Sequence, residues 1–116
     1  MVKISILYPK GENLRFDLCY YVEKHIPLSL KLVGQHPGFI GVSVEHGVAG
    51  VKPHSAATFV VCCHFLFDSI DDFRQAFMPY AAILQGEFAN YTDITPIIQV
   101  SEVLDLRAAY RAAEAA

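Results

Sequence analysis

The sequence predicts an α+β fold with one antiparallel sheet and helices on one of its faces. Two stretches repeat apolar residues at the three- and four-residue spacing of a helix, and four stretches show the alternating or continuously apolar pattern of strands. Their order is strand, helix, strand, strand, helix, strand. The third strand, residues 58–67, is apolar on both faces, so both faces need cover. A βαββαβ unit with a second copy across its bare face meets these conditions.

The first strand and the first helix come from the N-terminal part of the chain. Residues 2–8 alternate as a strand does, and Pro9 ends the pattern. Residues 16–33 repeat apolar side chains at helical spacing and form a wide apolar face. Asp17 stands where a carboxylate can cap this helix, and Gly34 stands where the helix is expected to end.

A hairpin follows the first helix. Residues 39–46 alternate like a second strand, and residues 47–57 contain the glycine, proline and small residues of a flexible loop. Residues 58–67 then form the third strand, which no charge interrupts. One of its faces carries Phe59, Val61, Cys63, Phe65 and Phe67, and the other carries Val60, Cys62, His64 and Leu66.

The second helix and the last strand complete the unit. Ser69 can cap the helix, and Asp72 can reach back to it as in a capping box. Pro79 should bend or interrupt the helix, since proline lacks the amide hydrogen and collides with the preceding turn. Residues 96–103 form the last strand, and the proline at its start indicates an edge position.

These elements predict a ferredoxin-like domain over residues 1–104, with both helices on one face of a four-stranded antiparallel sheet. Residues 105–116 form an alanine-rich tail, either a short helix or a frayed end. Two bare sheet faces pressed together would form a closed, barrel-like dimer and would protect the edge strands. The sequence therefore predicts a homodimer.

Composition limits the classes of function. A chain of 116 residues is long enough for one domain with a single core. Its hydrophobic content of 53% and charged content of 18% fit a chain that buries additional surface in an oligomer. The net charge of -3 and the lack of a basic cluster argue against nucleic acid as a partner. The N-terminal strand is too short and alternating for a signal peptide or a membrane span, so a cytoplasmic protein is expected.

Cys19, Cys62 and Cys63 are expected to be reduced core residues, because three cysteines do not make a disulfide framework. Cys62 and His64 share a strand face and could in principle bind a metal. Without a second pair at ligand spacing, no metal site is predicted. A nucleotide cofactor is not expected, since the chain lacks a glycine-rich phosphate loop and a dinucleotide fingerprint. The sequence identifies no other cofactor.

Several short segments occur in the order that is typical of one known family. They are Leu7-Tyr8-Pro9, Phe16-Asp17 with Tyr20-Tyr21, His25-Ile26-Pro27-Leu28, Phe67-Asp68-Ser69, Phe73 and Phe77, Asn90-Tyr91-Thr92-Asp93-Ile94 with Pro96, and Ser101-Glu102. Together they resemble the EthD family, named for bacterial ethyl tert-butyl ether degradation, over about residues 1–104. The resemblance implies the dimeric α+β barrel superfamily, whose relatives include cofactor-free oxygenases, polyketide cyclases, lactone isomerases and haem-handling enzymes. It implies no single reaction.

His25 is the predicted catalytic residue. It lies on the apolar stripe of the first helix, and Pro27 removes the amide that would bond the Glu23 carbonyl. His25 is therefore expected at a kink over a cavity. Histidine titrates at about pH 6.5, so it could serve as general acid or base, or ligate a metal or haem iron. The alternative is a structural histidine that bonds a backbone carbonyl or a tyrosine hydroxyl.

The predicted ligand-binding residues are Tyr8, Tyr21, Tyr91 and Asp93. Residues 90–93 offer an amide, a phenol, a hydroxyl and a carboxylate, although a turn is the favoured interpretation because asparagine and aspartate bond their own backbone. Within this segment, Tyr91 is the residue expected to reach a pocket. The other tyrosines lie at spacings that are more often those of core residues.

Two functions remain open at this point. The first is an enzyme that acts on a small apolar or aromatic compound in an oxidative degradation or biosynthetic pathway, with His25 moving a proton in oxidoreductase-like, isomerase or cyclase chemistry. The second is a non-catalytic ligand-binding or accessory protein for a pathway oxygenase. The lack of a base, an orienting residue and a nucleophile together in the sequence motivates the second. The relatives that the resemblance implies favour the first.

Overall fold

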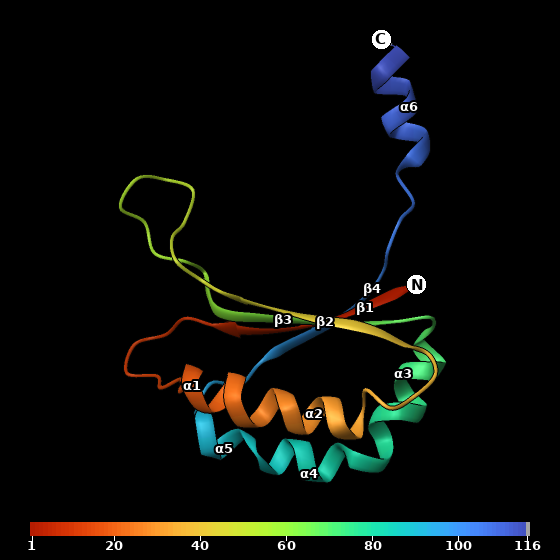
Figure 1. Ribbon diagram of the computed structural model, residues 1–116. Helices are drawn as coiled ribbons and strands as arrows, with labels where there is room; N and C mark the ends of the chain where they lie inside the picture. The colour runs from red at the N-terminus through yellow and green to blue at the C-terminus, as the bar shows by residue number, and fades with distance from the viewer. Residues whose placement is uncertain (116) are drawn as a thin grey trace.

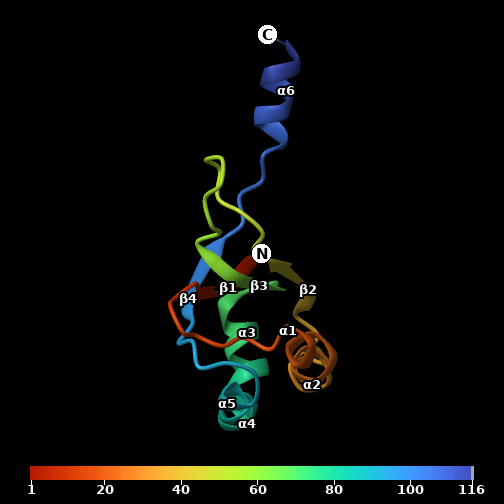
Figure 2. The same cartoon turned by 90° about the vertical axis from the view of Figure 1, so that its left-hand side faces the viewer.

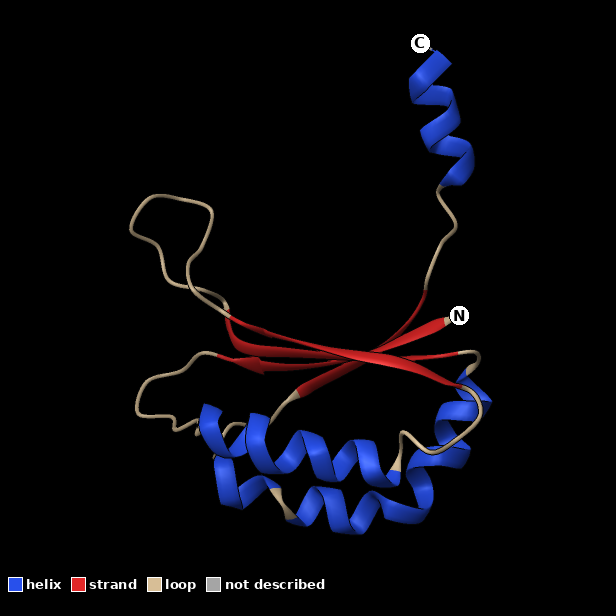
Figure 3. Cartoon of the chain, in the orientation of Figure 1, coloured by secondary structure: helices blue, strands red, loops and turns tan. Residues whose placement is uncertain are grey.

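The computed structural model describes residues 1–115, and these form two layers (Figures 1 and 3). One layer is an antiparallel sheet with the strand order β2-β3-β1-β4. The strands are β1 (Val2–Pro9), β2 (Phe39–His46), β3 (Phe59–Phe67) and β4 (Ile97–Glu102). The helices between β1 and β4 all cover the same face of this sheet (Figure 2). The predicted ferredoxin-like α+β architecture is confirmed.

The two faces of the central strands differ in burial. On the helix side, β1 and β3 bury the core residues Ile4, Tyr8, Val61, Cys63, Phe65 and Phe67. We call the other side the open face; its central residues are Lys3, Ser5 and Leu7 on β1 and Cys62, His64 and Leu66 on β3. The alternation predicted for β3 is therefore confirmed, because its open-face side chains Cys62, His64 and Leu66 are only half-buried. Strand β4 lies at an edge, as its leading proline predicts.

The first helical segment is regular only in part. It consists of α1 (Leu18–Tyr20), a π-helical turn η1 (Tyr21–His25) and α2 (Ile26–Leu32). Asp17 caps its start as predicted, since its carboxylate accepts a hydrogen bond from the Tyr20 N–H at 3.1 Å. Gly34 follows the end of the segment as predicted, but its backbone is not left-handed. A Cβ at this position would lie 2.5 Å from the Leu30 carbonyl oxygen, so close approach is what requires glycine.

The second helical segment is interrupted at the predicted proline. Helix α3 (Ile70–Phe77) passes into a 3-10 turn η2 (Met78–Tyr80) that contains Pro79, and α4 (Ala81–Gly86) and α5 (Phe88–Tyr91) follow. Ser69 caps α3 by accepting a hydrogen bond from the Asp72 N–H at 3.1 Å. The interpretation of residues 90–93 as a turn is wrong in part, because Asn90 and Tyr91 belong to α5.

Two segments project beyond the open face. Residues 47–57 form the predicted loop between β2 and β3, and the chain after β4 leads into α6 (Arg107–Ala115), the helical form expected for the tail. Figure 1 shows the loop and α6 rising on the side of the sheet that lacks helices, at opposite ends of it. Residue 116, also assigned to the tail, lies outside the described residues.

The cysteines are all free, but they are not all core residues. Cys63 is buried on the helix side, Cys62 is half-buried on the open face, and Cys19 is exposed on α1. The expectation that all three lie in the core is therefore wrong for Cys19, which is exposed, and for Cys62, which lies outside the core cluster. Among the helices of residues 1–115, none has the length and apolar character needed to cross a membrane.

Replacing the helix cap tests the local basis of the second helical segment. We expect Ser69→Ala to lower the free energy of unfolding by about 1 kcal/mol, because the Asp72 N–H loses its acceptor. Ser69→Asp should keep stability close to wild type, since aspartate also caps. Urea unfolding measures both variants. Equal losses for the two variants would contradict the capping explanation.

Candidate functional site

A cavity of about 220 Å³ lies between the sheet and the helices. Its walls come from β1, β3, β4 and from both helical segments, and most of the lining side chains are aliphatic or aromatic. The polar groups in the lining belong to Tyr8, Tyr21, His25, Ser29 and Gln85. No lysine, arginine or carboxylate lines the cavity among the described residues. The cavity therefore suits a ligand that is mostly apolar and uncharged.

His25 lines this cavity from the end of the π-helical turn. The turn is wider than an α-helix, because the Ile26 N–H bonds the Tyr21 carbonyl five residues earlier. Pro27 is the second residue of the next helix and cannot donate the bond that would continue regular α-helical geometry. The prediction that the helix is irregular at His25 and that this residue faces a cavity agrees with the structure. Such π-helical turns are frequent at functional sites.

The His25 side chain is buried without full hydrogen bonding. Its residue exposure is 6%, and its Nδ1 atom has no hydrogen-bond partner. The nearest charged atom is Oε1 of Glu87, at 3.5 Å, which is too long for a strong hydrogen bond. A buried polar atom without a partner costs free energy unless something else satisfies it. A small shift of Glu87 would do so.

Glu87 is itself held in place by two neighbours. The Tyr20 hydroxyl donates to Glu87 Oε2 at 3.1 Å, and the Asn90 amide donates to the same oxygen at 3.0 Å. The Asn90 amide also bonds the Tyr20 hydroxyl, at 3.2 Å. The other oxygen, Oε1, is directed toward His25. This arrangement orients a carboxylate behind an imidazole, which is how enzymes position a histidine base.

Two effects on the pKa of His25 oppose each other. Burial lowers the pKa, because it disfavours the charged imidazolium, and the Glu87 carboxylate raises it; the net direction is below the ordinary value. His25 is therefore neutral at neutral pH. A proton on Nδ1 would face Glu87, which favours the tautomer whose Nε2 is free to accept a proton.

Three tyrosines form a buried cluster beside His25. The Tyr8 and Tyr91 hydroxyls share a hydrogen bond of 2.9 Å, and the Tyr21 ring stacks on the His25 ring with centroids 5.4 Å apart. Tyr91 contacts His25 more closely, at 4.7 Å between centroids. Burial raises the pKa of all three phenols, so they remain protonated. The structure thus brings Tyr21 and Tyr91 against His25 and Tyr8 against both of them, although only Tyr8 and Tyr21 line the cavity.

Asp93 does not join this site. It is exposed, and its carboxylate accepts the Arg15 backbone N–H at 2.6 Å. The neighbouring Thr92 hydroxyl donates to the Arg15 carbonyl at 2.7 Å. Both contacts fix the segment that leads into α1. Asp93 therefore bonds the Arg15 backbone, away from His25. The carboxylate next to His25 belongs to Glu87 instead.

Glu87 is the residue that sequence reasoning missed. A signal was present, since Glu87 is the one charged residue between Pro79 and Asp93. A lone carboxylate in such a stretch is ordinarily a solvated residue on a helix surface. Its partnership with His25 depends on how two helical segments far apart in the sequence pack together, which periodicity does not show.

Cys62 and His64 have other neighbours. On the open face, Nδ1 of His64 shares a hydrogen bond of 2.8 Å with the Ser5 hydroxyl. Nε2 of the same ring lies 3.0 Å from Oε1 of Glu45. Within residues 1–115, no group of three histidine, cysteine or acidic residues is placed to hold a metal ion. The open-face polar residues are separate from the cavity on the helix side.

The fold and the site define a class: a ferredoxin-like α+β protein with a histidine at the wall of an apolar cavity. The family model described as the EthD domain matches residues 14–95. The chain belongs to the EthD family. The match includes the first helical segment and α5, and so includes His25 and Glu87. No curated protein matches the chain.

Solved structures support this membership. An EthD-like protein from Ralstonia eutropha is 36% identical, with a TM-score of 0.84 over 93% of this chain and 96% of its own. An ethyl tert-butyl ether degradation family protein from Bacillus halodurans has 21% identity and a TM-score of 0.61, over 90% of this chain and 99% of its own. The cofactor-independent oxygenase SnoaB of Streptomyces nogalater has 13% identity and a TM-score of 0.56, over 90% of this chain and 93% of its own. The last two show a shared fold.

The electrostatic coupling of His25 to Glu87 can be measured directly. We expect NMR titration to give His25 a pKa below the ordinary 6.5 in the wild-type protein, and a still lower pKa in Glu87→Gln, because the neutral amide no longer stabilises the imidazolium. Free energy of unfolding should fall as the pH drops below 6.5, since the unfolded chain then binds a proton that buried His25 resists. A His25 pKa that is unchanged in Glu87→Gln would contradict the coupling.

Proposed function

We propose that the protein is an enzyme that binds a small, uncharged aromatic compound in the cavity, and that His25 removes a proton from it. The observation that supports this most strongly is the buried His25 ring at the wall of an otherwise apolar cavity, with its Nδ1 atom 3.5 Å from Oε1 of Glu87. A neutral, buried histidine backed by a carboxylate is suited to be a general base. Glu87 would then stabilise the imidazolium as it forms.

The size and lining of the cavity support an aromatic ligand. A dry cavity of roughly 150 Å³ lined by aliphatic and aromatic residues accepts benzene. The cavity here, at about 220 Å³, would take one or two fused rings. Phe77 and Phe88 offer aromatic walls, and the absence of a lysine or arginine in the described lining disfavours carboxylates and phosphates. A phenolic hydroxyl would supply the proton that His25 accepts.

Oxidative chemistry is the reaction class we favour. Loss of a proton turns a phenol into an electron-rich phenolate, which gives up electrons to an oxidant such as molecular oxygen more readily than the phenol does. SnoaB, which shares the fold, is a cofactor-independent oxygenase. The family name also refers to an ether degradation pathway. These relationships support the reaction class, and the positions of His25 and Glu87 support the proton transfer.

A non-catalytic binding protein is the second candidate. It is favoured by one observation: His25 is the only residue of the described cavity lining whose ordinary pKa lies near neutral, so the lining offers no second acid or base. A binding protein for the same compound would use the apolar walls without needing the His25–Glu87 pair. Turnover separates the two candidates.

We also propose that the protein is a homodimer joined through the open face. The face leaves Leu7, Cys62 and Leu66 only half-buried on the central strands. A second copy would complete their burial. Sedimentation at micromolar concentration should give about twice the chain mass of 12.9 kDa. A mass equal to one chain would contradict the dimer.

A ligand panel tests the site. We expect electron-rich naphthols and phenols to raise the melting temperature of the wild-type protein, since a ligand at a hundredfold its dissociation constant stabilises the fold by about 2.7 kcal/mol. Haem, quinones and lactones belong in the same panel. His25→Gln should lower turnover of the best compound, followed as oxygen consumption, by about a hundredfold or more.

His46→Gln is the matched control, because His46 is an exposed histidine outside this cavity. It should leave turnover unchanged. Binding without oxygen consumption or product would support the accessory role instead. Unchanged turnover in His25→Gln would show that His25 is not the base.

A further inference from the structure

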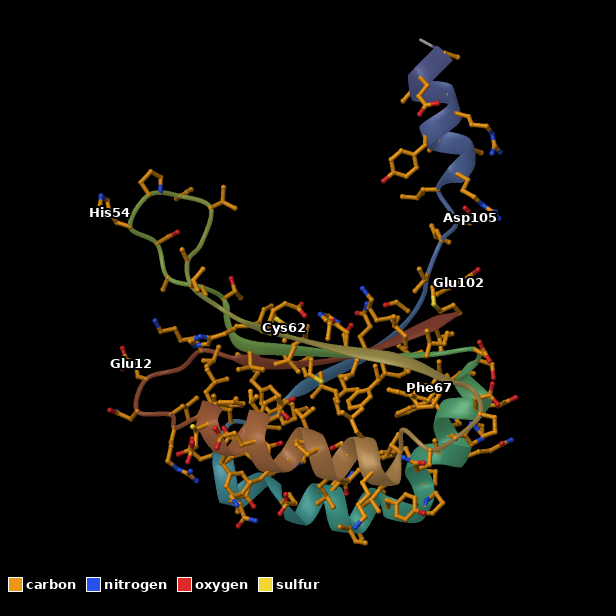
Figure 4. The ribbon with its side chains drawn as sticks, in the orientation of Figure 1. Glu12, His54, Cys62, Phe67, Glu102 and Asp105 are labelled. Atoms are coloured by element: carbon orange, nitrogen blue, oxygen red, sulfur yellow. The ribbon has the colours of Figure 1, made fainter. Side chains whose placement is uncertain are left out.

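The loop between β2 and β3 and the tail after β4 expose large apolar side chains with nothing packed against them. Val48 and Val51 in the loop are 89% and 105% exposed, and Leu104 and Tyr110 in the tail are 70% and 69% exposed. Figure 4 places His54 at the end of the loop and Asp105 at the start of the tail helix, both beyond the open face. Each segment reaches into the space that a second copy would occupy.

The radius of gyration and the accessible surface of the chain are both larger than those of a compact monomer of the same size. Its radius of gyration is 16.5 Å, whereas a compact domain of this length has about 13.4 Å. Its accessible surface is 7732 Å², whereas a folded monomer of this mass exposes about 6,300 Å². The excess of about 1,400 Å² is larger than the roughly 800 Å² that each partner buries in a standard interface.

We propose that the described residues after β4, 103–115, form an arm that packs against the β2–β3 loop of a second copy. In such a dimer, α6 of each copy contacts the β2–β3 loop of the other copy. This inference rests on the homodimer proposed above and adds the contact that holds it. The apolar side chains of both segments would be buried together, which is the main source of stability in such an interface.

Two-fold symmetry permits this exchange. The loop and the tail stand at opposite ends of the open face (Figure 1). Consider two copies whose open faces pack together, related by a two-fold axis that lies between the sheets and is perpendicular to the strands. This axis places the loop of each copy opposite the tail of the other. An axis along the strands would instead place loop against loop and tail against tail.

Charge and shape favour the pairing of loop with tail. Lys52 is the one charged residue of the loop at neutral pH, so loop against loop would bring two lysines together. The described tail balances Arg107 and Arg111 against Asp105 and Glu114, so it adds no net charge. Asp105 already pairs with Arg107, which leaves Glu114 as the carboxylate that would face the partner's Lys52. A groove of about 200 Å³ beside Val48 and Phe59, at the base of the loop, could receive an apolar side chain of the arm such as Tyr110.

Photo-crosslinking tests the contact in the full-length protein. Tyr110 is replaced by benzoylphenylalanine, which keeps an aromatic side chain, in a mixture of isotope-labelled and unlabelled copies. We expect crosslinks between copies that map to residues 47–57, identified by their mixed isotope masses. The same substitution at Met78, which is 66% exposed on the helix side, is the control and should give no crosslink to that loop.

The outcomes separate the arm from the dimer. A dimer by sedimentation with Tyr110 crosslinks only within one copy, or to the other copy's tail, would overturn the arm and leave the homodimer standing. A monomeric mass without crosslinks between copies would overturn both. Tyr110→Ser should raise the dimer dissociation constant by at least about tenfold, as loss of an interface aromatic does. Met78→Ser should not, and equal effects of the two variants would also overturn the arm.

Discussion

The hydrogen bond between the Tyr8 and Tyr91 hydroxyls joins parts of the chain that are 83 residues apart, and the geometry of the site depends on it. Tyr8 belongs to β1 and Tyr91 ends α5, so the bond attaches the second helical segment to the sheet. Both residues are completely buried, where leaving either hydroxyl unpaired would cost about 1–3 kcal/mol. The same attachment sets the position of Glu87, one turn before Tyr91, relative to His25.

Much of the architecture could be predicted because its causes are local. Asp17 and Ser69 each accept a hydrogen bond from a backbone N–H three residues later. Pro79 interrupts its own helix whatever the helix packs against. In β3, alternate side chains point to opposite faces, so the sequence alone predicts which side chains share a face. His25 could be singled out because Pro27 is nearby in the sequence.

The rest of the site could not be predicted in this way, because its causes are contacts between distant segments. Glu87 owes its orientation to Tyr20, 67 residues earlier. Asp93 was predicted to bind a ligand, yet its carboxylate accepts a hydrogen bond from the Arg15 backbone N–H, 78 residues away in sequence. Cys19 fits the apolar pattern of its helix, but the packing of the helix leaves it exposed. In each case the residue type suggests several partners, and tertiary packing selects one.

The sheet divides the molecule into two regions with different tasks. Its helix side holds the cavity and the His25–Glu87 pair, and its open side carries the surfaces assigned to a second copy. Strand β3 contributes to both regions, since Phe65 lines the cavity while Cys62 and Leu66 lie on the open face. A chain with such a strand needs cover on both sides, which links the ligand site and the dimer to one feature of the sequence.

A crystal structure of the protein grown with a naphthol would test the central claim most directly. We predict that the rings occupy the cavity between the sheet and the helices, with the hydroxyl oxygen within about 3.2 Å of a His25 ring nitrogen. An occupied cavity with the hydroxyl turned away from His25, or a naphthol bound only elsewhere on the protein, would contradict the role assigned to this histidine.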